Sequence, residues 1–325
     1  MNKLTKTLVT ICILGLLVCF LYPLYFQNQQ PELSVIYIPK TQDNTNDFWT
    51  TLISGTQMAA EEYNVNLTIL SPQEETDYKQ QNKLILEAAQ LKPDALVISP
   101  ISYTESTALL QEIKETYHIP IVLIDAVVSE PLEDTLIASD NYNAGKTMGE
   151  FALNYVQEHS QIGIVAHVPN TSTAMDREKG FRAGLGEMET KVVETVFSYS
   201  DFQTAYEVTK DLLTRYPNLS LIAGLNEYSA VGAGNAIKDL GLSGQVRVIG
   251  FDNSIAAVRL LEEDIFSGII IQKPFNMGYL GIETTYQLLT GKKVKSSIDS
   301  GTELITREDV YTKEGQQALF SFLRD

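Results

Sequence analysis

Val246-Arg247-Val248-Ile249-Gly250-Phe251-Asp252-Asn253 is a mainly apolar run that ends in two polar residues. A short apolar run beside a glycine is typical of a parallel strand buried on both faces. Because the carboxyl ends of such strands face the ligand crevice in open α/β sheets, Asp252 is a candidate ligand contact. The alternative is that Asp252, Asn253 or Ser254 caps the following helix, which is expected to extend to Leu261.

The same arrangement recurs along the chain. Apolar strands end at Asp125, at Asn226 and at Gln272, and helical patterns of ten to eighteen residues separate the strands. Strands that alternate with helices predict an α/β fold of parallel sheets flanked by helices. Polar residues from several strand ends are therefore expected at one shared edge.

Two helix starts add further candidates. Asn46 stands where it would cap a helix that begins at about Asp47, and Phe48 and Trp49 follow it. An aromatic ring there could stack on a sugar face or pack in the core, and for Trp49 the core is the safer prediction. Arg177 is expected in the first turn of its helix, where a cation is disfavoured, so it is either solvated or directed at a polar ligand.

These side chains suit a polyol, because carboxylates and amides pair with hydroxyl groups, arginine donates in a fork, and flat rings cover C–H faces. The predicted ligand-binding residues are Asn46, Phe48, Trp49, Asp125, Arg177, Asn226, Asp252 and Gln272.

Composition argues against other classes of function. The formal charge of −17 opposes binding to a nucleic acid backbone, which depends on Lys and Arg. The two cysteines, Cys12 and Cys19, leave the rest of the chain without a thiol or a disulfide. The three histidines are scattered and no phosphate-binding loop motif is present, so each histidine is expected on the surface or in the core. We expect no catalytic centre, no metal and no cofactor.

The N-terminus predicts a membrane segment. Lys3 and Lys6 precede an uncharged run over residues 8–26, long enough to cross a bilayer. An uncleaved anchor is favoured over a cleaved signal, and the run before Cys19 only half matches a lipoprotein signal. Either alternative places the body of the chain outside the cytoplasmic membrane.

Seven spans together resemble the ribose-binding-protein class of periplasmic binding proteins, which shares its type 1 fold with the effector domains of lactose-repressor-type regulators. The spans are Asn46-Asp47-Phe48-Trp49, Ile124-Asp125, Ala138-Ser139-Asp140-Asn141 with Gly145, Arg177-Glu178-Lys179-Gly180-Phe181, Gly224-Leu225-Asn226-Glu227, Gly250-Phe251-Asp252 and Ile271-Gln272-Lys273-Pro274. The resemblance implies two Rossmann-like lobes joined by three crossovers that close on a sugar. The sugar-contacting roles of the family would fall on the eight candidates. No helix-turn-helix precedes residue 33, which excludes the repressor branch.

The resemblance also suggests the organisation of the chain. We expect an anchor or signal segment at 1–32, a first lobe of 33–139 plus 273–298, and a second lobe of 140–272 plus 299–325. The expected role is a membrane-anchored receptor that signals to a sensor kinase, with the binding component of a sugar ABC transporter as the alternative. Ala126 and Ser99 depart from the family pattern, where Arg and Asn are frequent, and Met175 stands where the ribose binder itself has a further Arg. The loss of two cationic donors leaves a different sugar, a modified sugar or a signalling molecule such as an autoinducer open as the ligand.

Overall fold

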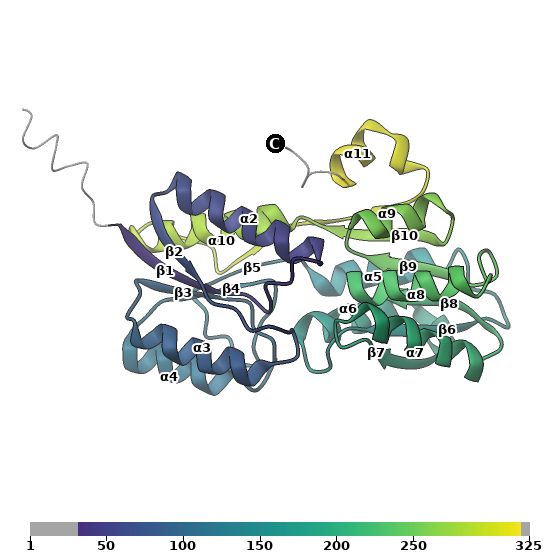
Figure 1. Cartoon of the computed structure of the whole chain (residues 1–325), viewed down its shortest axis with the longest axis horizontal. Helices are drawn as coiled ribbons and strands as arrows, with labels where there is room; N and C mark the ends of the chain where they lie inside the picture. The colour runs from purple at the N-terminus through teal and green to yellow at the C-terminus, as the bar shows by residue number, and fades with distance from the viewer. Residues whose placement is uncertain (1–31, 320–325) are drawn as a thin grey trace, which may run out of the picture.

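The computed structural model describes residues 32–319, and every strand in this range belongs to one of two six-stranded sheets. The sheets form the centres of two lobes that lie side by side (Figure 1). Two lobes of this kind confirm the α/β fold predicted from the alternating pattern.

The sheet of the first lobe is entirely parallel. Its central strands are wholly apolar and buried, as in the run Ile121-Val122-Leu123-Ile124, because helices cover both faces. In spatial order its strands are β11 (Ser297–Asp299), β5 (Thr135–Ala138), β4 (Ile121–Ile124), β3 (Ala95–Ile98), β1 (Leu33–Ile38) and β2 (Val65–Ile69).

The sheet of the second lobe is also parallel except at one edge, where β12 (Thr302–Ile305) pairs antiparallel with β10 (Phe266–Gln272). Within residues 246–253, Arg247–Phe251 forms β9, which lies beside the fully buried β10. In spatial order the strands are β12 (Thr302–Ile305), β10 (Phe266–Gln272), β9 (Arg247–Phe251), β8 (Leu219–Gly224), β6 (Gln161–Ala166) and β7 (Val192–Phe197).

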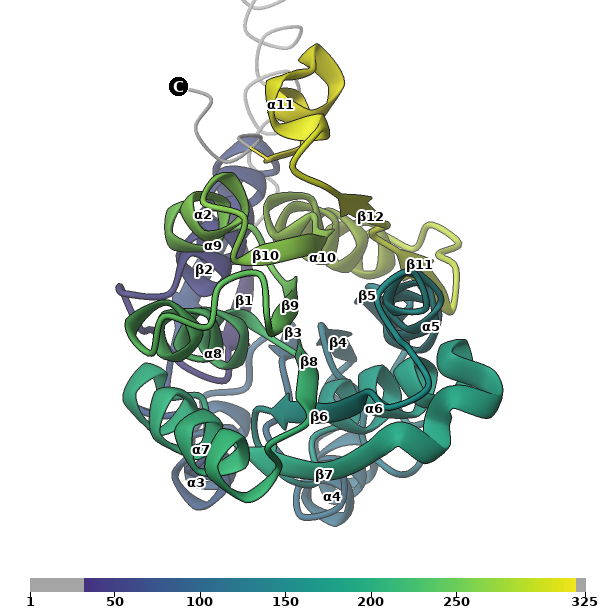
Figure 2. The same ribbon diagram turned by 90° about the vertical axis from the view of Figure 1, so that its right-hand side faces the viewer.

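Helices cover both faces of each sheet. In the first lobe, α2 (Asp47–Glu62) and α10 (Pro274–Leu289) cover one face, and α3 (Tyr78–Gln90) and α4 (Thr107–Tyr117) cover the other. Figure 2 shows the second lobe with α7 (Phe202–Arg215), α8 (Glu227–Asp239) and α9 (Ile255–Glu262) on one side and α5 (Asn141–Ala152) and α6 (Ser172–Leu185) on the other. The 3₁₀ turns η1 (Gly186–Lys191) and η2 (Asp309–Tyr311) and the helix α11 (Lys313–Leu319) complete the described chain.

Polar caps fix where most helices begin. At seven helices the cap side chain accepts a hydrogen bond from the backbone N–H three residues later, which pairs a donor that the helix leaves free. The caps are Asn46, Asp77, Asp140, Thr171, Asp201, Asn226 and Ser254. The predicted capping role of Asn46 is therefore confirmed, and Asp140 caps α5 in the same way.

The chain passes between the two sheets three times, after β5, after β10 and after β11. We propose the lobe boundaries given above on the basis of these passages. The predicted membrane segment lies outside the described residues. Across residues 32–319, no helix combines the length and apolar character needed to cross a bilayer.

Some local predictions were wrong. The sequence pattern over residues 103–117 predicts one helix, but α4 begins only at Thr107, because the Ser102 hydroxyl accepts from the backbone of Glu105 and holds a turn there. The short strand β11 was not predicted, since Ser297–Asp299 has little apolar character. The helix α6 begins at Ser172 after its cap Thr171, so Arg177 lies in the second turn and not in the first.

Candidate functional site

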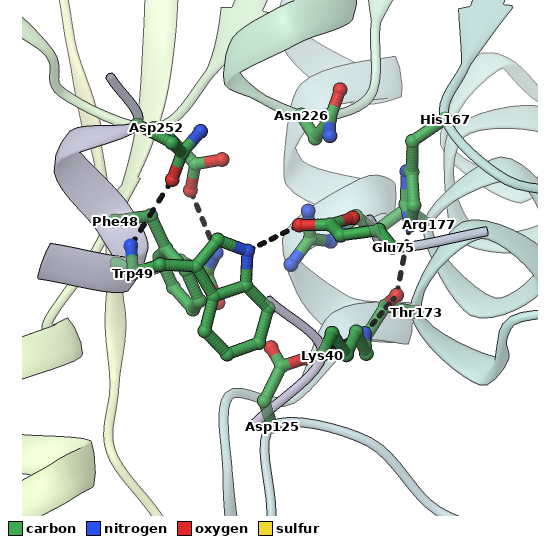
Figure 3. A pocket seen from close by; sticks show the side chains of 12 residues that line it. Lys40, Phe48, Trp49, Glu75, Asp125, His167, Thr173, Arg177, Asn226 and Asp252 are labelled. Atoms are coloured by element: carbon green, nitrogen blue, oxygen red, sulfur yellow. Dashed lines mark hydrogen bonds and ion pairs between the residues drawn. The ribbon is translucent and has the colours of Figure 1, made fainter. Parts of the chain in front are cut away.

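A cavity lies between the lobes, at the carboxyl ends of their strands, with about 300 Å³ free of protein atoms. All eight side chains predicted from the sequence line it, and they converge from both lobes (Figure 3). Four further residues complete the lining: Lys40, Glu75, His167 and Thr173.

Two aspartates occupy matching positions in the two lobes. Asp125 directly follows β4 and Asp252 directly follows β9, and both have a φ of 70°. Each backbone N–H donates to the neighbouring strand, Asp125 to Ile137 O at 2.9 Å and Asp252 to Ile270 O at 2.8 Å. A positive φ is uncommon for a residue with a side chain and concentrates at functional sites. Here it accompanies two buried carboxylates that face one cavity.

The cavity holds a buried ion pair in the first lobe. Lys40 Nζ lies 2.7 Å from Asp125 Oδ2, and the two side chains are 3% and 4% exposed. Ala126 and Met175 provide no cation, and the Met175 side chain is 45% exposed and outside the cavity lining. Lys40, just after the end of β1, therefore supplies a positive charge in the cavity, where Ala126 and Met175 supply none.

Arg177 is fixed in the second lobe by three contacts. Its Nε donates to Asn141 Oδ1 and its Nη1 to Leu225 O, both at 2.8 Å, and the guanidinium lies 3.9 Å from the Phe251 ring centroid. Burial lowers the pKa of Arg177, and the charge of Asp252 is the main opposing effect. The arginine is thus held as a rigid donor at the cavity wall.

Asp252 is not the helix cap that the sequence left as an alternative, because Ser254 caps α9. Its oxygens accept from Gln272 Nε2 at 2.7 Å and from the backbone N–H of Glu227 at 3.0 Å. Burial raises the pKa of Asp252, and Arg177 opposes the increase. Asn226 both caps α8 and lines the cavity.

The aromatic wall comes from the first turn of α2. Phe48 and Trp49 meet edge to face with ring centroids 5.1 Å apart, and the Asn46 side chain accepts from the Trp49 backbone at 3.0 Å. Trp49 packs in the first-lobe core as expected and also lines the cavity. Its indole Nε1 donates to Glu75.

Sequence reasoning missed four lining residues, two of which carried a signal. Lys40 lies two residues after the end of β1, and His167 directly follows β6. Both therefore lie at strand ends, where ligand contacts are expected. His167 is buried, which agrees with one of the two placements expected for a histidine, and it also lines the cavity. Glu75 lies in a loop and Thr173 in an early helix turn, and nothing in their surrounding sequence distinguishes them.

Two buried atoms of the cavity residues have no hydrogen-bond partner within the described chain: His167 Nδ1 and Gln272 Oε1. Burial lowers the pKa of His167 well below its usual value, so the ring is neutral. A buried polar atom left unpaired costs about 1–3 kcal/mol. A polar ligand in the cavity would remove that cost.

Hydrogen bonds also join the two lobes around the cavity, and in three of them an acidic side chain of the first lobe accepts from a donor in the second lobe. Tyr228 Oη donates to Asp43 at 2.6 Å, Ser200 Oγ to Glu75 at 2.6 Å, and the Ile255 backbone to Asp47 at 3.3 Å. These bonds describe a closed arrangement. Among residues 32–319, no group of His, Cys, Asp and Glu side chains is placed to hold a metal ion.

Comparisons with known proteins agree with this geometry. The family model described as "Periplasmic binding protein domain" matches residues 35–293. The ribose import binding protein RbsB of Bacillus subtilis (strain 168) is 25% identical over 95% of this chain and 100% of its own. RbsB of Escherichia coli (strain K12) is 26% identical over 81% of this chain and 88% of its own.

Solved structures of sugar-transport proteins are also similar to this chain. A sugar transporter from Clostridium phytofermentans is 39% identical with a TM-score of 0.80, covering 85% of this chain and 99% of that chain. A carbohydrate transporter solute binding protein from Agrobacterium radiobacter, in complex with D-arabinose, is 25% identical with a TM-score of 0.83, covering 90% of this chain and 100% of that chain.

Proposed function

We propose that this chain, which belongs to the family of periplasmic binding protein domains, binds a sugar-like solute between its lobes and delivers it to an ABC-type importer. The relatives named above support transport more than the sensor-kinase role that the N-terminal run suggested. The proposal places the lobes outside the cytoplasmic membrane.

The observation that carries the proposal is the convergence of eight sequence-predicted residues on one polar cavity with an aromatic wall. We assign to these eight residues the contacts with the ligand. The lobes contact each other beside this cavity through the bonds from Tyr228 to Asp43 and from Ser200 to Glu75, which limits the space between them. The proposed ligand is accordingly a single sugar ring and not an oligosaccharide.

The binding claim is tested by titrating a panel of monosaccharides and following the fluorescence of Trp49, the only tryptophan of the chain. We expect one or more sugars to change the emission saturably, and Asp252→Ala to abolish the change. Asp239→Ala makes the same substitution on the exposed end of α8 and should leave binding intact. A complete panel without binding would refute the proposed function.

Transport and sensing are separated in the host cell. Removal of the chain should abolish uptake of the radiolabelled ligand at low concentration, and restoring the chain should recover the uptake. If uptake stays unchanged while a ligand-induced transcriptional response is lost, the sensory role is correct and the importer role is wrong.

A further inference from the structure

The cavity carries an excess of acidic groups. Two cations line it, Lys40 and Arg177, together with three carboxylates, Glu75, Asp125 and Asp252. His167 adds no positive charge, since burial lowers its pKa well below the usual value. One carboxylate is therefore left without a cationic counterpart.

Glu75 is that carboxylate. Lys40 pairs directly with Asp125 at 2.7 Å, and Asp252 exerts the strongest charge effect on Arg177. The hydrogen bonds made to the Glu75 side chain come from neutral donors, Trp49 Nε1 in the same lobe and Ser200 Oγ in the other.

Neighbouring side chains donate to both oxygens of Glu75. Each oxygen accepts a hydrogen bond, one from an indole N–H, which can only donate. The side chain is buried and points into the cavity between Trp49 and Arg177 (Figure 3). Burial raises the pKa of Glu75, with Lys40 as the main opposing charge, so a cationic ligand group beside Glu75 would favour its ionised form.

A second observation also indicates a donor-rich ligand. Gln272 Nε2 is directed at Asp252, which leaves Gln272 Oε1 as an acceptor without a partner among the described residues. This side chain is 2% exposed and lines the cavity. An ammonium group combines the two properties that these side chains favour, because it has a positive charge and three donors.

We propose that Glu75 contacts the ligand and makes the cavity select an amino sugar over the corresponding neutral sugar. This inference rests on the proposed function and specifies its ligand class. The charge excess and the unpaired acceptor both favour a sugar whose substituent is a protonated amine, because a buried charge needs a counterpart.

The test is isothermal titration calorimetry with matched pairs at about pH 6.5, below the pKa of an α-amino group. The pairs are D-glucosamine with D-glucose, D-galactosamine with D-galactose, D-mannosamine with D-mannose, and 1-amino-1-deoxy-D-fructose with D-fructose. We expect at least one amino member to bind tenfold or more tightly than its neutral partner. Glu75→Gln should reduce that ratio to about one while neutral sugars still bind.

Glu74→Gln is the matched control, because it removes the same charge from the exposed neighbouring residue. It should keep the full preference for the amino member. If the neutral sugar of every binding pair binds equally well or better, or if Glu75→Gln keeps the preference, the inference is wrong and the proposed function stands. If none of the eight compounds binds, the result counts against both.

Discussion

Glu227 gives this fold a defined dependence on pH. Its carboxyl lies at the start of α8, buried where the two lobes meet. Desolvation raises its pKa to about 8, Asp252 and Asp47 reinforce the increase, and hydrogen bonds from the Phe48 backbone and the Ser254 side chain oppose it. Asp47 and Asp252 are the other charged residues of the small cavity beside it, and both are acidic.

Glu227 makes the folded state more stable at low pH than at high pH. Because the folded-state pKa of Glu227 is raised from 4.5 to about 8, its contribution to stability is fully present below about pH 4.5 and is lost as pH rises through 8. Each pKa unit corresponds to about 1.4 kcal/mol, so the whole change amounts to at most about 5 kcal/mol. Between about pH 5.5 and 7.5 it amounts to about 3 kcal/mol.

Glu227→Gln replaces the carboxyl with a neutral group of the same shape. We expect equal stability of variant and wild type near pH 5, and a variant that is more stable by about 2–4 kcal/mol near pH 8. Urea unfolding at several pH values measures the difference. Glu61→Gln, on the exposed face of α2, should follow the wild-type curve throughout. Parallel curves for Glu227→Gln and wild type would refute the reasoning.

Three further outcomes are expected. Asp125→Asn should lower the free energy of unfolding by about 3–5 kcal/mol in urea, because it leaves Lys40 buried without its counterion, and adding Lys40→Met should recover most of the loss. Gly145→Ala should cost about 1–3 kcal/mol in the same assay, since its Cβ would lie 2.2 Å from the carbonyl oxygen of Arg177; an unchanged midpoint would contradict this close contact. Because closure surrounds Glu227 with groups of both lobes, ligand affinity should fall from about pH 5.5 to 8 in calorimetric titrations, and Glu227→Gln should remove most of that fall.

The strand-end argument found most of the cavity because it rests on a topological fact. Parallel strands place their carboxyl ends at one edge, so the sequence alone groups Asp125, Asn226, Asp252 and Gln272, all of which line the cavity. His167 directly follows β6 and reaches the same edge. Neither metal-ligand spacing nor a base beside a nucleophile, the two patterns by which a histidine is recognised in sequence, detects a contact of this kind.

Glu75 shows where sequence reasoning ended. Its loop after β2 has no periodicity, and its partner Ser200 is 125 residues away in the other lobe. Such contacts depend on how the lobes close, which no local pattern encodes. Arg177 illustrates a related limit: its inward direction was predicted from a helix-dipole argument that fails in the second turn, whereas Asn141, Leu225 and Phe251 actually fix it.

Opening of the lobes should leave the charge interactions of the cavity in place. Lys40 pairs with Asp125 in one lobe, and Arg177 and Asp252, whose charges interact, lie together in the other, so a hinge motion separates neither set. Opening would break hydrogen bonds between the lobes, such as those from Ser200 to Glu75 and from Lys40 to Thr173, each worth about 1–3 kcal/mol net with a charged partner. Three bonds of this size would favour the closed arrangement over the open one by about 3–9 kcal/mol. A ligand can shift this balance only by the difference between its affinities for the two arrangements.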